Sequence, residues 1–387
     1  MKKIAVVTST RAEYGLLKPL IAALKKEPGF QTDLIVTGTH LLEEFGNTYK
    51  YIEADGFDIT EKIAIPMDAR SPEDISHSMS VILEKFSGYF SKSENRPDIL
   101  IVLGDRFEIP AICMTAVNER IPIAHIAGGE ATEGAIDEAY RHAVTKMSQL
   151  HFTSCEEYRR RVIQLGENPE KVFNVGSLMI ENILSLEDVS RDKIEEFLGF
   201  NLDRDYALMT FHPVTLEDDT AGLQSEEIIK AMDAFPDIDF ICTKANADAG
   251  GMIINEMLEK KAEESDHIHL YSSLGQSRYL SLMKNAVCVL GNTSSGIGEA
   301  PIFRTPTVNV GDRQKGRVRA ASIIDCEPVA GNIVAAIEKA RSPRFISSIR
   351  NMENPYGDGH ASEKIVEVLK REMEKGIDIK KKFYDIS

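Results

Sequence analysis

Short apolar segments alternate with longer segments of helical periodicity along the first half of the chain. The apolar segments share a high content of β-branched and aliphatic residues, and they begin at Lys3, Asp33, Asp98, Ile121, Leu150 and Val172. Such alternation is typical of βαβ units, in which helices connect parallel strands of one sheet. It predicts a doubly wound domain over residues 1–178.

The same alternation starts again after a charged helical segment at residues 187–200. The second series of predicted strands begins at Tyr206, Asp239, His267, Ala286 and Thr305. A second domain is therefore expected over residues 179–360. The amphipathic segment 361–387, with Ile365 and Leu369 on its apolar face, is expected to return to the first domain. The predicted fold class is α/β, with two Rossmann-like doubly wound domains.

Charge and cysteine usage narrow the possible partners and compartment. The 387 residues contain 61 acidic and 45 basic side chains, a net charge of −16, which argues against general affinity for nucleic acid or an anionic membrane. The five cysteines are scattered without a C-x-x-C pair, as in a protein of the reducing cytoplasm. No run is long enough for a membrane span or a signal-peptide core.

The most unusual residues follow the predicted strands. Turn-forming or polar clusters occur at residues 8–11, 104–106, 128–130, 291–296 and 311–313. In open α/β sheets, ligands bind at the carboxyl ends of the strands. These clusters are therefore the candidates for a functional site.

The segment GNTSSGIGEAP, residues 291–301, has the small residues of a phosphate-binding turn. Backbone N–H groups and the hydroxyls of Thr293 and Ser294 would meet a phosphate, and Glu299 would accept hydrogen bonds from ribose hydroxyls. An ordinary capped turn is the alternative. The segment is neither a Walker loop nor a G-x-G-x-x-G fingerprint.

Two arginines offer forks that match a diphosphate. Arg11 follows the first strand, where a capping salt bridge with Glu13 is the alternative. Arg313 belongs to the basic segment GDRQKGRVR, for which a solvated loop without anion contact is the alternative.

Acidic residues gather at two neighbouring strand ends. Asp105 follows one buried strand, and the segment 124–142 places Glu130, Glu133 and Asp137 after the next. Like charges raise one another's pKa, which prepares one group as acid and another as base. Asp105 could instead be a helix cap. Glu138 and His142 have the spacing of an ordinary helical pair.

His212 ends the first strand of the second half, and a structural role competes there with a catalytic one. The nine histidines show no metal-site spacing with a carboxylate partner.

Eight motifs in order, TRAEYG, GDRFE, HIAGGE, DEAYRH, FHPVT, GNTSSG, GDRQKGR and YGDGHA, cover almost the whole chain. Together they resemble the hydrolysing nucleotide-sugar 2-epimerases, which include the UDP-N-acetylglucosamine 2-epimerases of bacterial sialic-acid synthesis. The resemblance implies a GT-B fold, with the sugar in a cleft between the domains and the nucleotide held mainly by the second. It also implies a homodimer or homotetramer without metal or cofactor.

The resemblance further implies that UDP-N-acetylglucosamine and water give N-acetylmannosamine and UDP. The family's nucleotide contacts fall on Arg11, Arg106, Asn246, Thr293, Ser294, Glu299 and Arg313. Its catalytic groups fall on Asp105, Asp137 and His212.

Two positions depart from the family pattern. Ala127 replaces an acid that some members carry, so that Glu130 or Glu133 is expected to supply an equivalent carboxylate. Gly298 replaces a frequent arginine, which removes one potential substrate contact.

The chemistry explains why two acid–base groups are needed. The C2 proton of an acetamido sugar becomes acidic only as the diphosphate leaves C1, and elimination then gives a glycal. Water adds to C1 while an acid protonates C2 on the opposite face. Which group removes the proton and which returns it stays open.

Three rival functions remain. The first keeps the reaction but uses a diacetamido-trideoxyhexose on UDP or GDP, N,N'-diacetylbacillosamine. The second is a GT-B glycosyltransferase, and the third is a sugar-nucleotide sensor without turnover.

Overall fold

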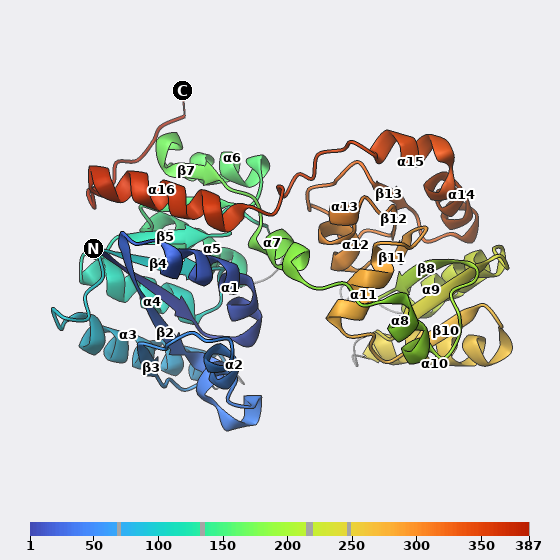
Figure 1. The fold of residues 1–387 in the computed structure, drawn as a ribbon, viewed down its shortest axis with the longest axis horizontal. Coiled ribbons are helices and arrows are strands. Elements are labelled where there is room, and N and C mark those ends of the chain that lie inside the picture. The colour runs from blue at the N-terminus through green and yellow to red at the C-terminus, as the bar shows by residue number, and fades with distance from the viewer. Residues whose placement is uncertain (68–70, 132–135, 214–219, 246–248, 387) are drawn as a thin grey trace. The chain divides into compact units, whose positions relative to one another are not determined.

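The computed structural model describes residues 1–67, 71–131, 136–213, 220–245 and 249–386. The chain forms two compact units (Figure 1). The first unit combines Met1–Leu184 with Tyr356–Ser387, and the second is Ser185–Pro355. The divisions predicted from the sequence fall after residues 178 and 360.

A seven-stranded parallel sheet forms the centre of the first unit. Its strands are β1 (Lys2–Thr8), β2 (Phe30–Thr37), β3 (Glu61–Ile63), β4 (Ile99–Leu103), β5 (Ile123–Ile126), β6 (Leu150–Thr153) and β7 (Val172–Asn174). The strand order is β3-β2-β1-β4-β5-β6-β7, with Ile4 in register with Ile99. Successive strands are added on one side of β1 up to β3 and on its other side from β4 onward. Ligands bind in such sheets at the point between β1 and β4 where the strand order reverses.

Helices cover both faces of this sheet, which is why the central strands are apolar at nearly every position. They are α1 (Arg11–Lys26), α2 (Tyr49–Ala54), α3 (Pro72–Phe90), α4 (Glu108–Asn118), α5 (Asp137–Met147), α6 (Glu156–Gln164), α7 (Leu178–Ser185) and α16 (Ala361–Lys375). Three short 3₁₀ turns add η1 (Gly38–Leu41), η2 (Glu43–Phe45) and η3 (Pro169–Lys171).

The last helix, α16, belongs to the first unit, beside α1 (Figure 1). Ile365, Val368 and Leu369 are buried in the same apolar core as Leu17 and Leu24 of α1. The apolar face of α16 therefore packs with α1 and buries part of this face of the first sheet.

The second unit repeats the design with a six-stranded parallel sheet. Its strands are β8 (Asp205–Thr210), β9 (Ile238–Thr243), β10 (Ile268–Tyr271), β11 (Val289–Gly291), β12 (Thr307–Val310) and β13 (Ile323–Cys326). The order β10-β9-β8-β11-β12-β13 places the reversal between β8 and β11. Its apolar core includes Met209, Phe240 and Leu290.

The helices of the second unit follow the same alternation. They are α8 (Arg191–Leu198), α9 (Thr220–Asp233), α10 (Ala249–Glu264), α11 (Gln276–Met283), α12 (Ser294–Gly298), α13 (Ala300–Phe303), α14 (Ala330–Arg341) and α15 (Pro343–Ile349). Within the described part of the chain, none of the helices has the length and apolar character needed to cross a membrane.

Candidate functional site

Arg141 of α5 connects the two acid-bearing turns of the first unit. Its guanidinium pairs with the carboxylate of Asp105, just after β4, and donates to the backbone oxygen of Glu130 at 2.7 Å. It also donates to the carboxylate of Glu138 at 3.1 Å. Only 6% of the Arg141 side chain is exposed, so the fork is fixed by these partners. The structure thus brings together the ends of β4 and β5, as the strand-end argument expects.

Asp137 is the first residue of α5 and is half-buried. It precedes Glu138, whose carboxylate is held by Arg141, so the helix that anchors Asp105 also carries Asp137. Sequence reasoning missed Arg141, although the quoted motif DEAYRH contains it.

The other acids of this loop have separate surroundings. The carboxylate of Glu130 accepts a hydrogen bond from the Ser154 hydroxyl at 3.0 Å, at the end of β6. Glu138 and His142 form the expected helical pair, with 3.2 Å between Oε1 and Nε2. Ala127 adopts a positive φ of 67°, which costs a non-glycine residue about 1 kcal/mol or more. Glu133 lies outside the described residues.

His125 of β5 hydrogen-bonds to the turn after β4 and to α5. Its Nε2 lies 3.0 Å from the backbone oxygen of Gly104 and therefore donates, so Nδ1 accepts from the Thr145 hydroxyl at 3.2 Å. Burial lowers the pKa of His125 to about 3, which keeps the ring neutral. A side chain at Gly128 would come within 3.1 Å of His125 Nδ1, a tight contact that would require His125 to shift. His125 thereby ties the residue before Asp105 to α5.

Both candidate arginines of the first unit lie at the β1/β4 reversal. Arg11 begins α1, is exposed, and has its guanidinium 5.1 Å from the Tyr51 ring centroid. Arg106 is also exposed, and its Nε donates to the buried carboxylate of Glu108 at 3.0 Å.

Glu13 does not serve as an ion-pair partner in the α1 cap. Its carboxylate accepts from the backbone N–H groups of Ser9 at 2.7 Å and Thr10 at 3.3 Å, while Thr10 caps the Glu13 N–H in return. This is a capping box.

The buried Glu13 makes the stability of the first unit depend on pH. Burial, with a smaller contribution from Glu108, raises the pKa of Glu13 from 4.5 to about 7. Because the folded pKa is the higher one, its stabilising contribution is complete below pH 4.5 and is lost as pH rises through 7. The loss is about 3 kcal/mol at 1.4 kcal/mol per pKa unit. In calorimetric melts from pH 4.5 to 8, Glu13→Gln should flatten this decline.

A matched control for that measurement is Glu53→Gln, because Glu53 is about half exposed and pairs with Lys62. It should preserve the parent's decline. A parent protein whose melting temperature does not change from pH 4.5 to 8 would contradict the expectation.

In the second unit, a pocket of about 370 Å³ opens at the carboxyl ends of β8 to β11. It is lined by Thr210, His212, Thr243, Lys244, Ser272, Ser273, Leu274, Gly275, Gln276, Tyr279, Leu280, Thr293, Ser295 and Glu299. The β8/β11 reversal lies within this set of strand ends, as expected for a ligand site. Three residues predicted from the sequence, His212, Thr293 and Glu299, share this pocket.

Asn292, which sequence reasoning did not single out, positions His212. The Asn292 side chain accepts from the His212 N–H and donates to the His212 carbonyl, both at 2.8 Å. Its own carbonyl accepts from Arg313 at 3.1 Å and Gln314 at 2.8 Å. Asn292 is 1% exposed. Its side chain and its backbone carbonyl together join the end of β8 to the loop after β12.

The turn after β11 carries a hydroxyl cap, which is the feature expected from the alternative of an ordinary capped turn. The Thr293 hydroxyl accepts from the Ser295 N–H at 3.3 Å, and Ser294 is exposed. Burial raises the pKa of Glu299. Tyr279, another residue missed from the sequence, is half-buried beside it. Asn246, the remaining predicted contact, lies outside the described residues.

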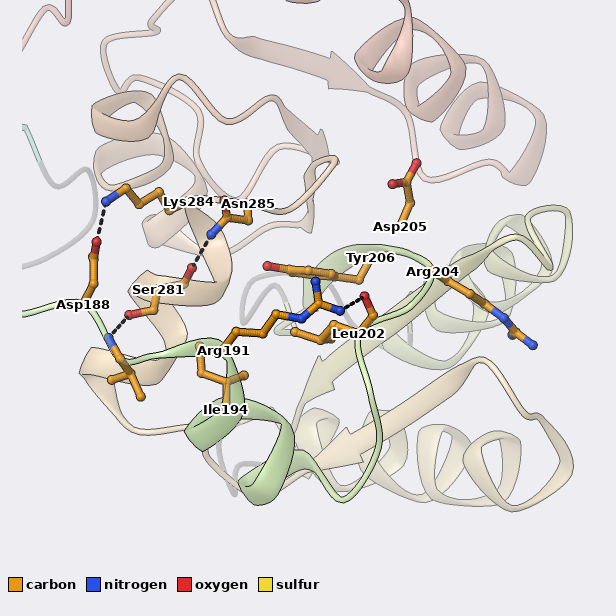
Figure 2. Close-up of a pocket in the computed structure, with 11 residues that line it drawn as sticks. Asp188, Arg191, Ile194, Leu202, Arg204, Asp205, Tyr206, Ser281, Lys284 and Asn285 are labelled. Atoms are coloured by element: carbon orange, nitrogen blue, oxygen red, sulfur yellow. Dashed lines mark hydrogen bonds and ion pairs between the residues drawn. The ribbon is translucent and has the colours of Figure 1, made fainter.

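A larger cavity of about 550 Å³ lies elsewhere in the second unit and contains none of the predicted site residues (Figure 2). It adjoins the first residues of β8, including Asp205 and Tyr206. Its charges already have partners: Lys284 pairs with Asp188 at 2.6 Å, and Arg191 pairs with Glu195 at 2.7 Å. We therefore place the candidate site at the smaller pocket.

Asp188 and Val189, near the start of the second unit, also line this cavity. The Val189 N–H donates to the Ser281 hydroxyl of α11 at 2.9 Å. Figure 2 shows Ser281 near the Lys284–Asp188 pair. The N-terminal half of α11 contributes Gln276 and Tyr279 to the smaller pocket.

Comparison with known proteins identifies relatives along the whole chain. The chain is 42% identical over 387 residues to polysialic acid biosynthesis protein P7 of Escherichia coli, covering 100% of this chain and 98% of the relative. It is 39% identical over 386 residues to the GDP/UDP-N,N'-diacetylbacillosamine 2-epimerase (hydrolyzing) of Campylobacter jejuni, covering 100% and 99%.

Solved structures show the same fold. The UDP-N-acetylglucosamine 2-epimerase of Neisseria meningitidis bound to UDP-N-acetylglucosamine matches with a TM-score of 0.77 at 19% identity, over 96% of this chain and 100% of that one. The enzyme of Methanocaldococcus jannaschii matches with a TM-score of 0.76 at 20% identity, with the same coverage. The predicted two-domain α/β fold of the GT-B type is confirmed.

The family profile described as UDP-N-acetylglucosamine 2-epimerase matches residues 22–370. With relatives at 42% and 39% identity over the full length, this confirms the resemblance that the eight motifs indicate. The chain belongs to the UDP-N-acetylglucosamine 2-epimerase family.

Proposed function

We propose that this protein is a hydrolysing 2-epimerase that converts UDP-N-acetylglucosamine and water to N-acetylmannosamine and UDP, for sialic-acid-type sugar synthesis. The observation that carries the proposal is the Arg141 junction, which fixes the carboxylate of Asp105 on the helix that begins with Asp137. Two carboxylates on fixed elements at the ligand-binding edge of a sheet suit a reaction with two proton transfers at one carbon.

The first step is an elimination. The bond between C1 and the diphosphate oxygen breaks, a base takes the C2 proton, and the C2–H electron pair forms the C1=C2 double bond of a glycal. The leaving UDP carries the negative charge, which Arg11, Arg106 and Arg313 would stabilise. Arg106 is suited to this because its Nε is held by Glu108 while the guanidinium is half-exposed.

The second step is hydration. The oxygen of water bonds to C1 while a base takes one of its protons, and an acid gives a proton to C2 on the face opposite the one that lost it, which inverts that carbon. Asp105, Asp137 and His212 share these proton transfers, and Glu130 supplies the carboxylate that Ala127 lacks. Retaining the glycal between the steps requires exclusion of solvent.

The pocket of the second unit suits the nucleotide. Thr293 and Ser294 would approach a phosphate through hydroxyls and backbone N–H groups, with Arg313 nearby. Glu299 would accept hydrogen bonds from the ribose, and Asn246 would add a further contact.

A second candidate substrate is N,N'-diacetylbacillosamine carried on UDP or GDP. It is favoured by the relatives named for that activity, at 39% identity in Campylobacter jejuni and 33% in Legionella pneumophila. The reaction and the site residues would be the same.

The deciding experiment incubates purified protein in D₂O with UDP-N-acetylglucosamine and with UDP- and GDP-N,N'-diacetylbacillosamine, followed by NMR. We expect a free sugar inverted at C2 and carrying deuterium there, from one of the three donors. A glycosyltransferase would leave C2 unlabelled and require an acceptor, and a sensor would leave every donor intact.

We also propose that the protein is cytoplasmic and forms a homodimer or homotetramer, as the family resemblance implies. Light scattering after size-exclusion chromatography distinguishes these from a monomer.

A further inference from the structure

Two buried carboxyl groups meet at the β1/β4 reversal of the first unit. The Ser9 hydroxyl lies 2.8 Å from Glu13 Oε2 and 3.2 Å from Glu108 Oε1. Glu13 is 8% exposed and Glu108 is fully buried. We call Glu13, Ser9 and Glu108 the carboxyl bridge. It joins the turn after β1 to the turn after β4.

The contacts of the bridge require more protons than Ser9 can supply. A serine hydroxyl carries one proton and can make one full-strength hydrogen bond to a carboxylate oxygen at a time. If both glutamates were ionised, the other contact would bring two lone pairs together. One proton on either carboxyl group allows a continuous chain, in which one glutamate donates to Ser9 and Ser9 donates to the other.

The second oxygen of Glu108 supports a shared proton. Glu108 Oε2 is buried and has no hydrogen-bond partner among the described residues. A buried carboxylate oxygen without a donor costs several kcal/mol, and the same atom in a neutral carboxyl group costs less. Two adjacent buried carboxylates would also repel each other.

We propose that Glu13 and Glu108 share one proton through Ser9, and that the singly charged bridge positions Arg106 for substrate binding. The role in binding rests on the proposed function. Glu13, Ser9 and Glu108 are positioning residues here, because they act through Arg106.

The charges around the bridge fit a single negative charge. Arg106 Nε donates to Glu108 Oε1 at 3.0 Å, which provides one positive partner. His40, whose Nε2 lies 3.2 Å from the Thr8 hydroxyl, stays neutral because burial lowers its pKa to about 4. Asp105 is engaged by Arg141, and Arg11 is exposed. The raised pKa of Glu13, about 7, agrees with a retained proton.

The bridge matters for binding because of where it lies. It fixes the turn that precedes Arg11 and the turn that contains Asp105 and Arg106. With Nε held by Glu108, the two terminal nitrogens of Arg106 remain available for bidentate contact with a phosphate. Loss of the bridge would therefore weaken substrate binding more than it slows proton transfer.

Infrared difference spectroscopy tests the shared proton without reference to activity. At pH 6, the parent protein should show the carbonyl band of a protonated carboxyl group that disappears in both Glu13→Gln and Glu108→Gln. Glu119→Gln is the matched control, since Glu119 caps the other end of α4 and faces Arg96. It should keep the band. A band that persists in both bridge variants, or that is absent from the parent, would overturn the shared proton.

Kinetics test the positioning role. Glu108→Ala should raise KM for the nucleotide sugar about tenfold while kcat stays within about threefold, since it removes one charged hydrogen bond from Arg106. Glu108→Gln, which keeps an acceptor for Arg106, should restore KM and alter the alkaline limb of the kcat/KM profile. Glu119→Gln should match the parent.

A parent-like KM in folded Glu108→Ala, or a parent-like pH profile in Glu108→Gln, would reject positioning through Arg106. Absence of turnover by the parent on every donor would instead reject the proposed function. The infrared result would then still decide the shared proton.

Discussion

Asp105→Asn should lower kcat/KM by about a thousandfold, the largest effect expected of any single substitution at the site. Removing a positioned acid–base group costs about 10² to 10⁴ in rate. The substitution also removes one of the two carboxylates that the Arg141 guanidinium, 6% exposed, contacts. Steady-state release of UDP and of the free sugar measures the loss, and NMR of the reaction mixture shows whether glycal accumulates.

The matched control is Asp98→Asn, at the opposite end of β4, where the exposed carboxylate accepts from the Lys3 N–H at 2.8 Å. We expect its turnover to stay within about threefold of the parent, because surface substitutions rarely have large effects. If folded Asp105→Asn kept parent-like turnover, Asp105 would not be a proton-transfer group.

Gly291→Ala should destabilise the second unit by about 3 kcal/mol or more and abolish nucleotide binding. Gly291 ends β11 with φ of 121°, and an added Cβ would lie 2.0 Å from the backbone oxygen of Thr210 in β8. Both the strained backbone and the collision act at the β8/β11 reversal, where Asn292 and His212 are joined. Differential scanning calorimetry and UDP titration measure the two losses.

Gly331→Ala provides the contrast, because Gly331 lies in the first turn of α14 and has no atom within 4 Å of an added Cβ. It should raise stability by about 0.5 to 1 kcal/mol. A Gly291→Ala protein that melts like the parent would show that β8 and β11 separate readily.

The strand pattern predicted eleven strands, and all eleven are present, but it missed β3 and β13. Both are edge strands. β3 has three residues, two of them charged, and β13 has four residues that include the exposed Asp325. β7 and β10 are edge strands as well, so the two omissions follow from the short, charge-containing sequences of β3 and β13 and not from their position.

The strand-end rule also selected many residues of the candidate site, since parallel strands bring their carboxyl ends to one edge whatever the loops contain. It could not reveal Arg141, Asn292 or the carboxyl bridge. Ser9 and Glu108 are 99 residues apart, and Asn292 and His212 are 80 apart. Such pairings depend on the register of β1 with β4 and of β8 with β11, which no local pattern encodes.

The return of α16 to the first unit has a consequence for biosynthesis. Leu17 and Leu24 share their core with Leu369, which is synthesised after the whole of the second unit. The second unit, Ser185–Pro355, is continuous and can complete its core first although its codons are read later. The unit that carries Asp105 and Asp137 therefore completes its core only after α16 has been synthesised, and until then its nascent chain exposes an apolar helix face to chaperones.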